Sequence, residues 1–144
     1  MNTSSFLAIS QKILHAYNKL CEPLLAEYDI PQVSFDILMF LTNNPKYVTA
    51  QEISEMRHIK KNLVSVHVDK LVSAGFLKRS SIADDRRKIA LSCTEKAKPI
   101  IQAGHKLQEN FYSTLTAGID DSMWSVFNKI NATLEINAEL ILKS

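Results

Sequence analysis

The chain has 144 residues, of which 46% are apolar and 22% charged, a composition that fits one soluble globular domain. With a net charge of +2, only three glycines and four prolines, it favours helices over turn-rich β architectures. No apolar stretch is long enough for a transmembrane helix, and the N-terminus lacks a signal-peptide pattern. We therefore expect a cytoplasmic protein that makes no membrane contact.

The first third of the chain predicts two helices. Apolar residues at three- and four-residue steps predict a long helix over residues 5–28, with Pro23 inside it. The sequence Asp-Ile-Pro at 29–31 ends that helix. A short helix over residues 34–43 follows, and because it is apolar on most sides we expect it to be buried.

A second pair of helices is predicted before the middle of the chain. Thr49 and Glu52 have the spacing of a capping box, which predicts a third helix that ends near residues 57–58. The fourth helix is predicted over residues 60–74, and Gly75 suits the left-handed residue that ends many helices. The residues expected to face inwards are Ile53 and Met56 in the third helix, and Leu63 or Val64, His67 or Val68, and Leu71 in the fourth.

The second half of the chain begins with a predicted hairpin. Residues 76–80 and 88–92 are expected to form two strands, joined by a polar, charged tip over residues 81–87. A long helix over residues 94–116 follows. A last helix, capped by Asp120 or Asp121, extends to about residue 142.

Positive charge is concentrated in one segment. Residues 57–88 carry +6, whereas the remainder of the chain carries −4. The basic residues are Arg57, Lys60, Lys61, Lys70, Lys78, Arg79, Arg86, Arg87 and Lys88. A basic stripe on an otherwise acidic protein indicates a polyanionic partner.

The predicted helix pair followed by a basic hairpin has the order of a winged helix-turn-helix. In such a domain the second helix enters the major groove of DNA and presents its outer face to the bases. With Val64, Val68 and Leu71 turned inwards, its early outward residues are Lys60, Lys61, Asn62 and Ser65, and Val66 and Asp69 are further candidates. Exposed lysines are common on amphipathic helices, so the helix pair alone does not decide between DNA binding and a plain helical domain. The charge asymmetry favours DNA.

Two segments resemble the MarR family of transcriptional regulators. Residues 85–96 read DRRKIALSCTEK, which is similar to the wing signature of that family. Residues 69–79 read DKLVSAGFLKR, which resembles its passage from the fourth helix into the first strand. Ala97 and Cys93 depart from the pattern, since the family usually has Gly and Leu there.

The resemblance implies a mainly α (α+β) fold: a single MarR-like domain over 1–144, a winged helix-turn-helix over 33–94, and dimerisation helices over 1–30 and 95–144. It also implies a homodimeric, ligand-responsive repressor of a pseudo-palindromic operator in double-stranded DNA. Asp85 and Arg87 are expected to support the wing, and Arg86 to reach the minor groove from its tip. The candidate DNA-binding residues are Lys60, Lys61, Asn62, Ser65, Arg79, Arg86, Arg87 and Lys88.

Surplus apolar residues on the terminal helices support self-association. They are Phe6, Ile9, Ile13, Phe111, Tyr112, Leu115, Trp124, Phe127 and Leu134. The resemblance further implies a small, aromatic effector between the dimerisation helices and the DNA-reading helices. Its candidate lining residues are Tyr17, Phe35, Met39, Phe40 and Phe111, for which plain core packing is the alternative.

Three other interpretations remain open at this point. A winged-helix protein-interaction module uses the same fold without reading DNA. A redox-sensing role for Cys21 is a second alternative, although the neighbouring Glu22 disfavours a thiolate. An enzyme is the third, but the sequence has no nucleophile–base pair, glycine-rich phosphate loop or metal-ligand spacing, so we expect no catalysis, cofactor or metal.

Overall fold

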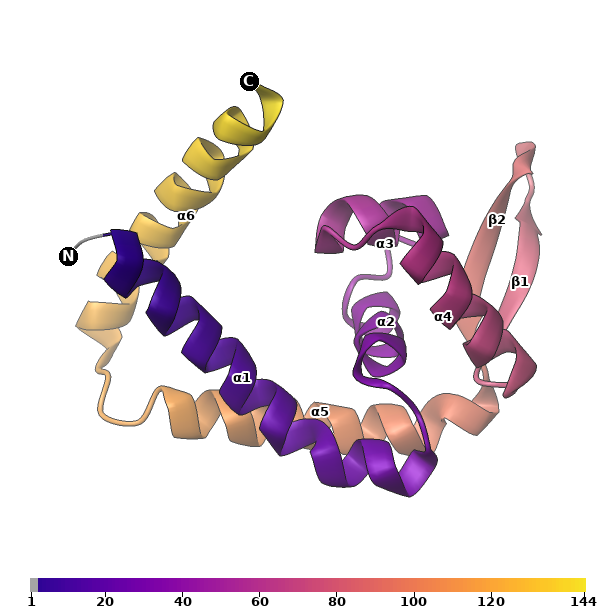
Figure 1. Cartoon of the computed structure of the whole chain (residues 1–144), viewed down its shortest axis with the longest axis horizontal. Helices are drawn as coiled ribbons and strands as arrows, with labels where there is room; N and C mark the ends of the chain where they lie inside the picture. The colour runs from indigo at the N-terminus through magenta and orange to yellow at the C-terminus, as the bar shows by residue number, and fades with distance from the viewer. Residues whose placement is uncertain (1–2) are drawn as a thin grey trace. The chain divides into compact units, whose positions relative to one another are not determined.

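The computed structural model describes residues 3–144 and confirms the mainly helical fold with a small wing (Figure 1). The elements are α1 (Thr3–Tyr28), α2 (Gln32–Asn43), α3 (Ala50–Arg57), α4 (Lys61–Ser73), β1 (Leu77–Ile82), β2 (Asp85–Cys93), a 3-10 turn (Glu95–Ala97), α5 (Lys98–Leu115) and α6 (Asp121–Lys143). None of the helices within residues 3–144 is long and apolar enough to cross a membrane.

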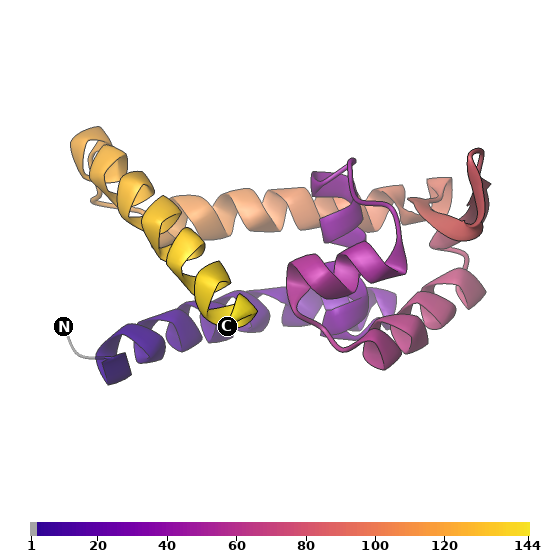
Figure 2. The same cartoon turned by 90° about the horizontal axis from the view of Figure 1, so that it is seen from above.

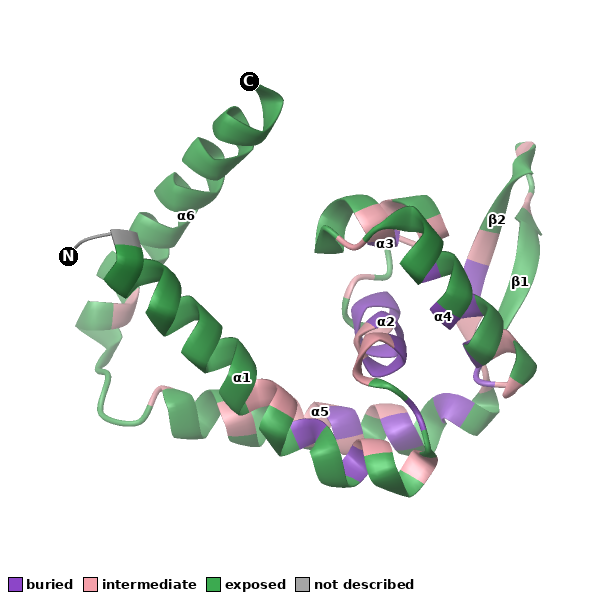
Figure 3. Cartoon of the chain, in the orientation of Figure 1, coloured by how far each residue is buried: buried purple, intermediate pink, exposed green. Residues whose placement is uncertain are grey.

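The chain divides into two compact units, residues 1–111 and residues 112–144. In the first unit α2 is the centre of the core, because its residues from Ser34 to Leu41 are buried with the single exception of Asp36 (Figure 3). Side chains from the helix-turn-helix, the wing and α5 pack around it. The core outside α2 includes Cys21, Leu24, Ile53, Val64, Val68, Leu71, Leu77, Leu91 and Ile100.

The start of α3 and the end of α4 follow the sequence signals. Thr49 and Glu52 form the predicted capping box at the start of α3. Gly75, with φ of 84°, follows α4 in the predicted left-handed conformation. Beyond it, the Thr94 hydroxyl donates to the Gly75 carbonyl at 2.5 Å and Lys96 Nζ donates to the Ala74 carbonyl at 2.6 Å. These bonds fix the passage from α4 into the wing. Figure 2 shows α4 and the wing at one end of the first unit, away from the start of α1.

The wing differs from its predicted form. β1 and β2 pair antiparallel from Leu77–Cys93 to Ile82–Asp85, with a bulge between Ser81 and Ile82. The expected seven-residue tip over 81–87 is therefore wrong, because only Ala83 and Asp84 form the turn. The apolar alternation used to place the strands fails here since most of the outer wing is exposed to water, and backbone pairing does not need alternating side chains.

Met56 is a second correction, because its side chain is exposed whereas Ile53 is fully buried as predicted. In the second unit Asp120 caps α6 as expected, its carboxylate accepting the Met123 amide at 2.9 Å. Trp124 stacks on Tyr112 and meets Phe127 edge-on, so this unit has a small aromatic cluster of its own.

Candidate nucleic-acid interface

The two faces of α4 are sharply divided. Val64, His67, Val68 and Leu71 are buried against the core. The opposite face presents exposed side chains whose spacing is that of one helical stripe. Its members are Asn62, Ser65, Val66, Asp69 and Ser73.

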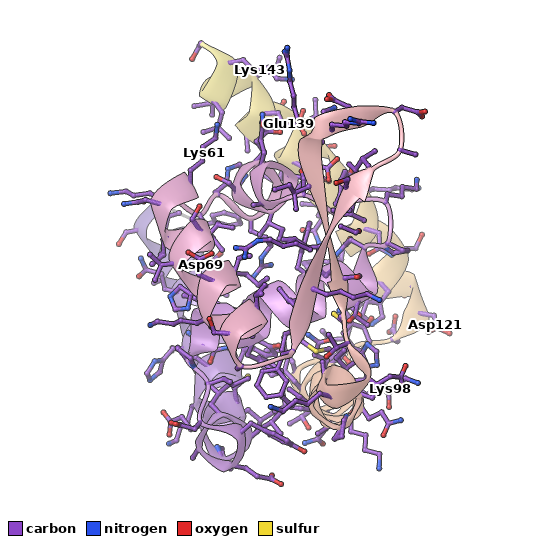
Figure 4. All side chains as sticks on the ribbon, turned by 90° about the vertical axis from the view of Figure 1, so that its right-hand side faces the viewer. Lys61, Asp69, Lys98, Asp121, Glu139 and Lys143 are labelled. Carbon is purple, nitrogen blue, oxygen red and sulfur yellow. The ribbon has the colours of Figure 1, made fainter. Side chains whose placement is uncertain are left out.

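Positive charge lies at the start of α4. Lys60 occupies the N-cap position, Lys61 begins the helix, and both are exposed. Figure 4 labels Lys61 at this end of α4. In the described chain Lys60 makes no side-chain capping bond, and the side-chain oxygen Oδ1 of Asn62 accepts the Leu63 amide at 3.0 Å. The lysines and the positive end of the helix dipole make this end attractive to phosphate.

The turn between α3 and α4 is held by local bonds. His58 has φ of 52°, in the left-handed region, and ends α3. Ser54 Oγ donates to the Ile59 carbonyl at 2.6 Å, while the Ile59 amide donates to the Ser54 carbonyl at 3.2 Å. This pair of bonds fixes the direction in which α4 leaves the turn.

Arg79 and Asp69 form an ion pair between β1 and α4. Asp69 lies on the outward face of α4 in Figure 4. Arg79 was predicted as a DNA contact, and here its guanidinium neutralises the one acidic side chain of the outward stripe. The pair also joins α4 to the wing.

The base of the wing is joined to the helix-turn-helix. The Leu91 amide donates to the Val48 carbonyl at 2.7 Å, so the residue before the α3 cap is bonded to β2. Glu52 accepts the amides of Val48 and Thr49 at 2.7 and 2.9 Å. These backbone bonds, with Lys88 nearby, lower the pKa of the Glu52 carboxyl and keep it ionised as a cap.

Three basic residues of the wing lie on β2, and Lys78 and Arg79 lie on β1. Arg86, Arg87 and Lys88 are exposed and follow directly after the turn. Asp85 Oδ1 accepts the backbone amide of Arg87 at 3.0 Å, which shapes the first residues of the strand. The structure thus places the eight candidate DNA-binding residues on two neighbouring elements, α4 with its cap and the wing.

A cavity of about 350 Å³ lies between α1, α2 and α5 in the first unit. Four of the five candidate effector residues line it, namely Tyr17, Met39, Phe40 and Phe111. Phe35, the fifth, is fully buried in the core behind them. The other lining residues, which the sequence did not indicate, are Ser10, Ile13, Leu14, Asp36, Asn43, Asn44, Arg57 and Gln108.

Polar groups of the cavity are tied to each other. Gln108 Nε2 donates to the Tyr17 hydroxyl at 3.0 Å, and Asn43 Nδ2 donates to Gln108 Oε1 at 3.1 Å. Burial raises the pKa of Tyr17 to about 12, so the phenol stays neutral. Burial also raises the pKa of Asp36, against the opposing effects of the Gln32 hydrogen bond and of Arg57. No sequence pattern marks these contacts, because they join helices far apart in the chain.

The cysteines are free in the structure, and Cys21 is fully buried. Burial raises the pKa of both the Cys21 and the Cys93 thiol, which disfavours the reactive thiolate. Residues 3–144 contain no group of three or more His, Cys, Asp or Glu placed to hold a metal ion.

Comparison with known proteins gives the same fold. Residues 28–88 match the family model described as MarR family. The transcriptional regulator PA3341 superposes with a TM-score of 0.82 at 21% identity, over 96% of this chain and 98% of that one. A MarR protein from Peptoclostridium difficile gives 0.81 at 19% identity, over 96% and 90% of the two chains.

A MarR transcriptional regulator from Methanosarcina mazei gives a TM-score of 0.75 at 20% identity, over 94% of this chain and 99% of that one. No curated protein sequence matches the chain. At these identities the solved structures show the fold, and the family match covers the helix-turn-helix and most of the wing. The predicted resemblance to the MarR family is confirmed.

Proposed function

This chain matches the MarR family of transcriptional regulators over residues 28–88, and we propose that it acts as a homodimeric, ligand-responsive repressor that binds a pseudo-palindromic operator. The observation that carries the proposal is the basic surface of the reader. The exposed cations of α4 and its cap, Lys60 and Lys61, and those of β2, Arg86 to Lys88, belong to a segment with a charge of +6. The rest of the chain is net acidic.

In this proposal α4 enters the major groove. Lys60 and Lys61 contact phosphates near the start of the helix, and Asn62 and Ser65 face base edges. Arg86 extends from the start of β2 towards the adjacent minor groove, while Arg87 and Lys88 contact the backbone. Asp85 supports the wing through its bond to the Arg87 amide.

The proposal of a dimer is supported by exposed apolar surface in both units. α1 exposes Phe6, Ile9 and Ile13, and α6 exposes Phe127, Ile130 and Leu134, too much large apolar surface for a monomer in water. An open apolar groove of about 530 Å³ on the second unit is lined by residues 119–130. We propose that a second copy of the chain covers these faces, and that 1–30 and 95–144 act as dimerisation helices of a single domain.

The effector proposal rests on the cavity beside α2. Its volume of about 350 Å³ suits a molecule built on one aromatic ring, and the Tyr17 and Phe111 rings meet edge-on at 5.1 Å in its wall. Arg57, the last residue of α3, also borders it. A ligand there contacts both a long helix and the reader, so its binding is expected to be coupled to DNA affinity.

The decisive experiment measures binding of the intact chain to duplexes selected from a random pool, at several salt concentrations. Repressor-like DNA binding predicts a palindromic selection, half-sites about one helical turn apart, and a logarithm of affinity that falls steeply with the logarithm of salt. Arg86→Ala is expected to weaken binding and leave the dimer intact. A protein-interaction module predicts neither selection nor a salt slope, and a monomeric mass at micromolar concentration overturns the dimer.

A further inference from the structure

Two large apolar side chains are exposed on α4, near its basic start. Val66 has 48% of its surface exposed and Leu63 has 41%, although both belong to a helix whose other face fills the core. Valine is a weaker helix former than the long polar residues that a solvated helix face usually carries. The stability of α4 therefore gives no reason for Val66 at this position.

Asn62 and Val66 form one recognition pair. They are four residues apart on α4, so their side chains are neighbours on the same face, separated along the helix by about 6 Å. That separation is the length of about two stacked base pairs. Both lie at the end of α4 that carries Lys60 and Lys61, where phosphates would bring the helix closest to DNA.

The chemistry of the pair selects a base composition. An asparagine amide both donates and accepts, and so it matches N6 and N7 of adenine in the major groove. Asn62 Oδ1 accepts the Leu63 amide at 3.0 Å, and its second lone pair is the one that would accept from the adenine. A valine offers only methyl groups, and the apolar feature of the major groove is the C5 methyl of thymine. The one side chain on this stripe that would select cytosine, Asp69, is held by Arg79.

We propose that Asn62 and Val66 read an adenine–thymine step in each half-site, Asn62 by hydrogen bonds to an adenine and Val66 by contact with a thymine methyl. Arg79 acts beside them as a positioning residue that withholds Asp69 from the bases. The proposal rests on the proposed DNA-binding function and adds its specificity. The surrounding cations favour DNA over an apolar protein surface as the partner of Val66.

The test replaces each thymine of the selected duplex in turn by deoxyuridine, which removes only the methyl group. Deoxyuridine at one position in each half-site is expected to weaken binding of the wild-type protein about fourfold, the loss that corresponds to one buried methyl group. Val66→Ala is expected to bind the thymine duplex about fourfold more weakly, and to lose nothing further with deoxyuridine at that position. Asn62→Ala is expected to lose about tenfold in discrimination at an adenine within two base pairs.

Ser73→Ala is the matched control, because Ser73 is exposed on the same outward stripe but lies two turns further along α4. It should keep the wild-type response to every deoxyuridine. Selective, salt-dependent binding without any deoxyuridine effect overturns the adenine–thymine reading and leaves the proposed function standing. Absence of duplex binding overturns both the proposed function and the adenine–thymine specificity. The same holds if Val66 lies in an interface with another protein that excludes DNA.

Discussion

Ser34 Oγ and His67 Nδ1 lie 2.9 Å apart in the interior of the first unit, joining the central helix α2 to α4. Ser34 is 1% exposed and His67 is 8% exposed. The surrounding core is apolar, so each group depends on the other for its hydrogen bond. The pair therefore holds the buried face of α4 in one position while the opposite face is free for a partner.

Replacing Ser34 by alanine should destabilise the protein. The buried His67 nitrogen would lose its partner, and an unsatisfied buried polar group costs about 1–3 kcal/mol. Urea denaturation followed by circular dichroism measures the free energy of unfolding. Ser73→Ala, at an exposed position of α4, serves as control and should stay within about 0.5 kcal/mol of wild type. Equal stability of the two variants would show that the Ser34–His67 bond contributes nothing.

His67 should make stability depend on pH in the range below neutrality. Burial, with a smaller effect from Lys70, lowers the pKa of His67 from its ordinary 6.5. Above pH 6.5 the histidine is neutral in both states and its contribution is constant. As the pH falls below 6.5 the unfolded chain binds the proton more readily, so the free energy of unfolding decreases, by at most about 1.4 kcal/mol per pH unit.

Urea midpoints measured between pH 7.5 and about 5 would show this decrease, since histidine titrates there and carboxyls mostly do not. His67→Gln is the control, because glutamine keeps a polar group without a titrating proton. The decrease should be smaller in that variant. A parallel pH dependence of the two proteins would assign the effect to other groups.

Gly104 marks the closest approach of α5 to α2. A Cβ atom there would lie 2.6 Å from the Met39 sulfur and 3.0 Å from a ring carbon of Phe35. Gly104→Ala should lower the free energy of unfolding by about 1 kcal/mol, because overpacking outweighs the gain in helix propensity. Combining it with Met39→Ala should cost less than the sum of the two single changes. A more stable single variant would show that the two side chains move aside freely.

Breaking the Arg79–Asp69 ion pair should change the affinity for DNA more than it changes the free energy of unfolding. Both side chains are largely exposed, so the ion pair contributes little to folding. Arg79→Ala removes a cation and unmasks a carboxylate on the reading face, which is expected to weaken duplex binding about fivefold. Adding Asp69→Ala should restore part of the loss. If the double variant binds as weakly as Arg79→Ala, the arginine contacts DNA directly and does not act through Asp69.

The sequence predicted the helices of the helix-turn-helix well because their signals are local. The spacing of Thr49 and Glu52 predicted the start of α3, and Gly75 predicted the end of α4. The outward position of Asn62 and Ser65 followed from helical spacing once Val64 and Val68 were turned inwards. The extent of the wing was not predictable in this way, because its strands are held by backbone pairing between solvated residues.

The cavity shows the opposite case. Its aromatic residues, such as Tyr17 and Phe111, were candidates through the family resemblance, but their polar partners were not. Gln108 reaches Tyr17 across 91 positions of sequence, and Asp36 and Arg57 face the cavity from α2 and α3. Such contacts depend on how helices pack, and nothing in the spacing of residues along one helix encodes them.

The sequence by itself determined the helices, their caps, the basic character of residues 57–88 and the order of elements that makes a winged helix. These follow from short-range hydrogen bonding, periodicity and charge, which a chain carries in its local pattern. The tertiary structure decided which side chains are free: it paired Arg79 with Asp69, buried His67 against Ser34 and left Val66 exposed on the outward face of α4. Those outcomes depend on distances between separate elements, which are fixed only when the core of the first unit is packed.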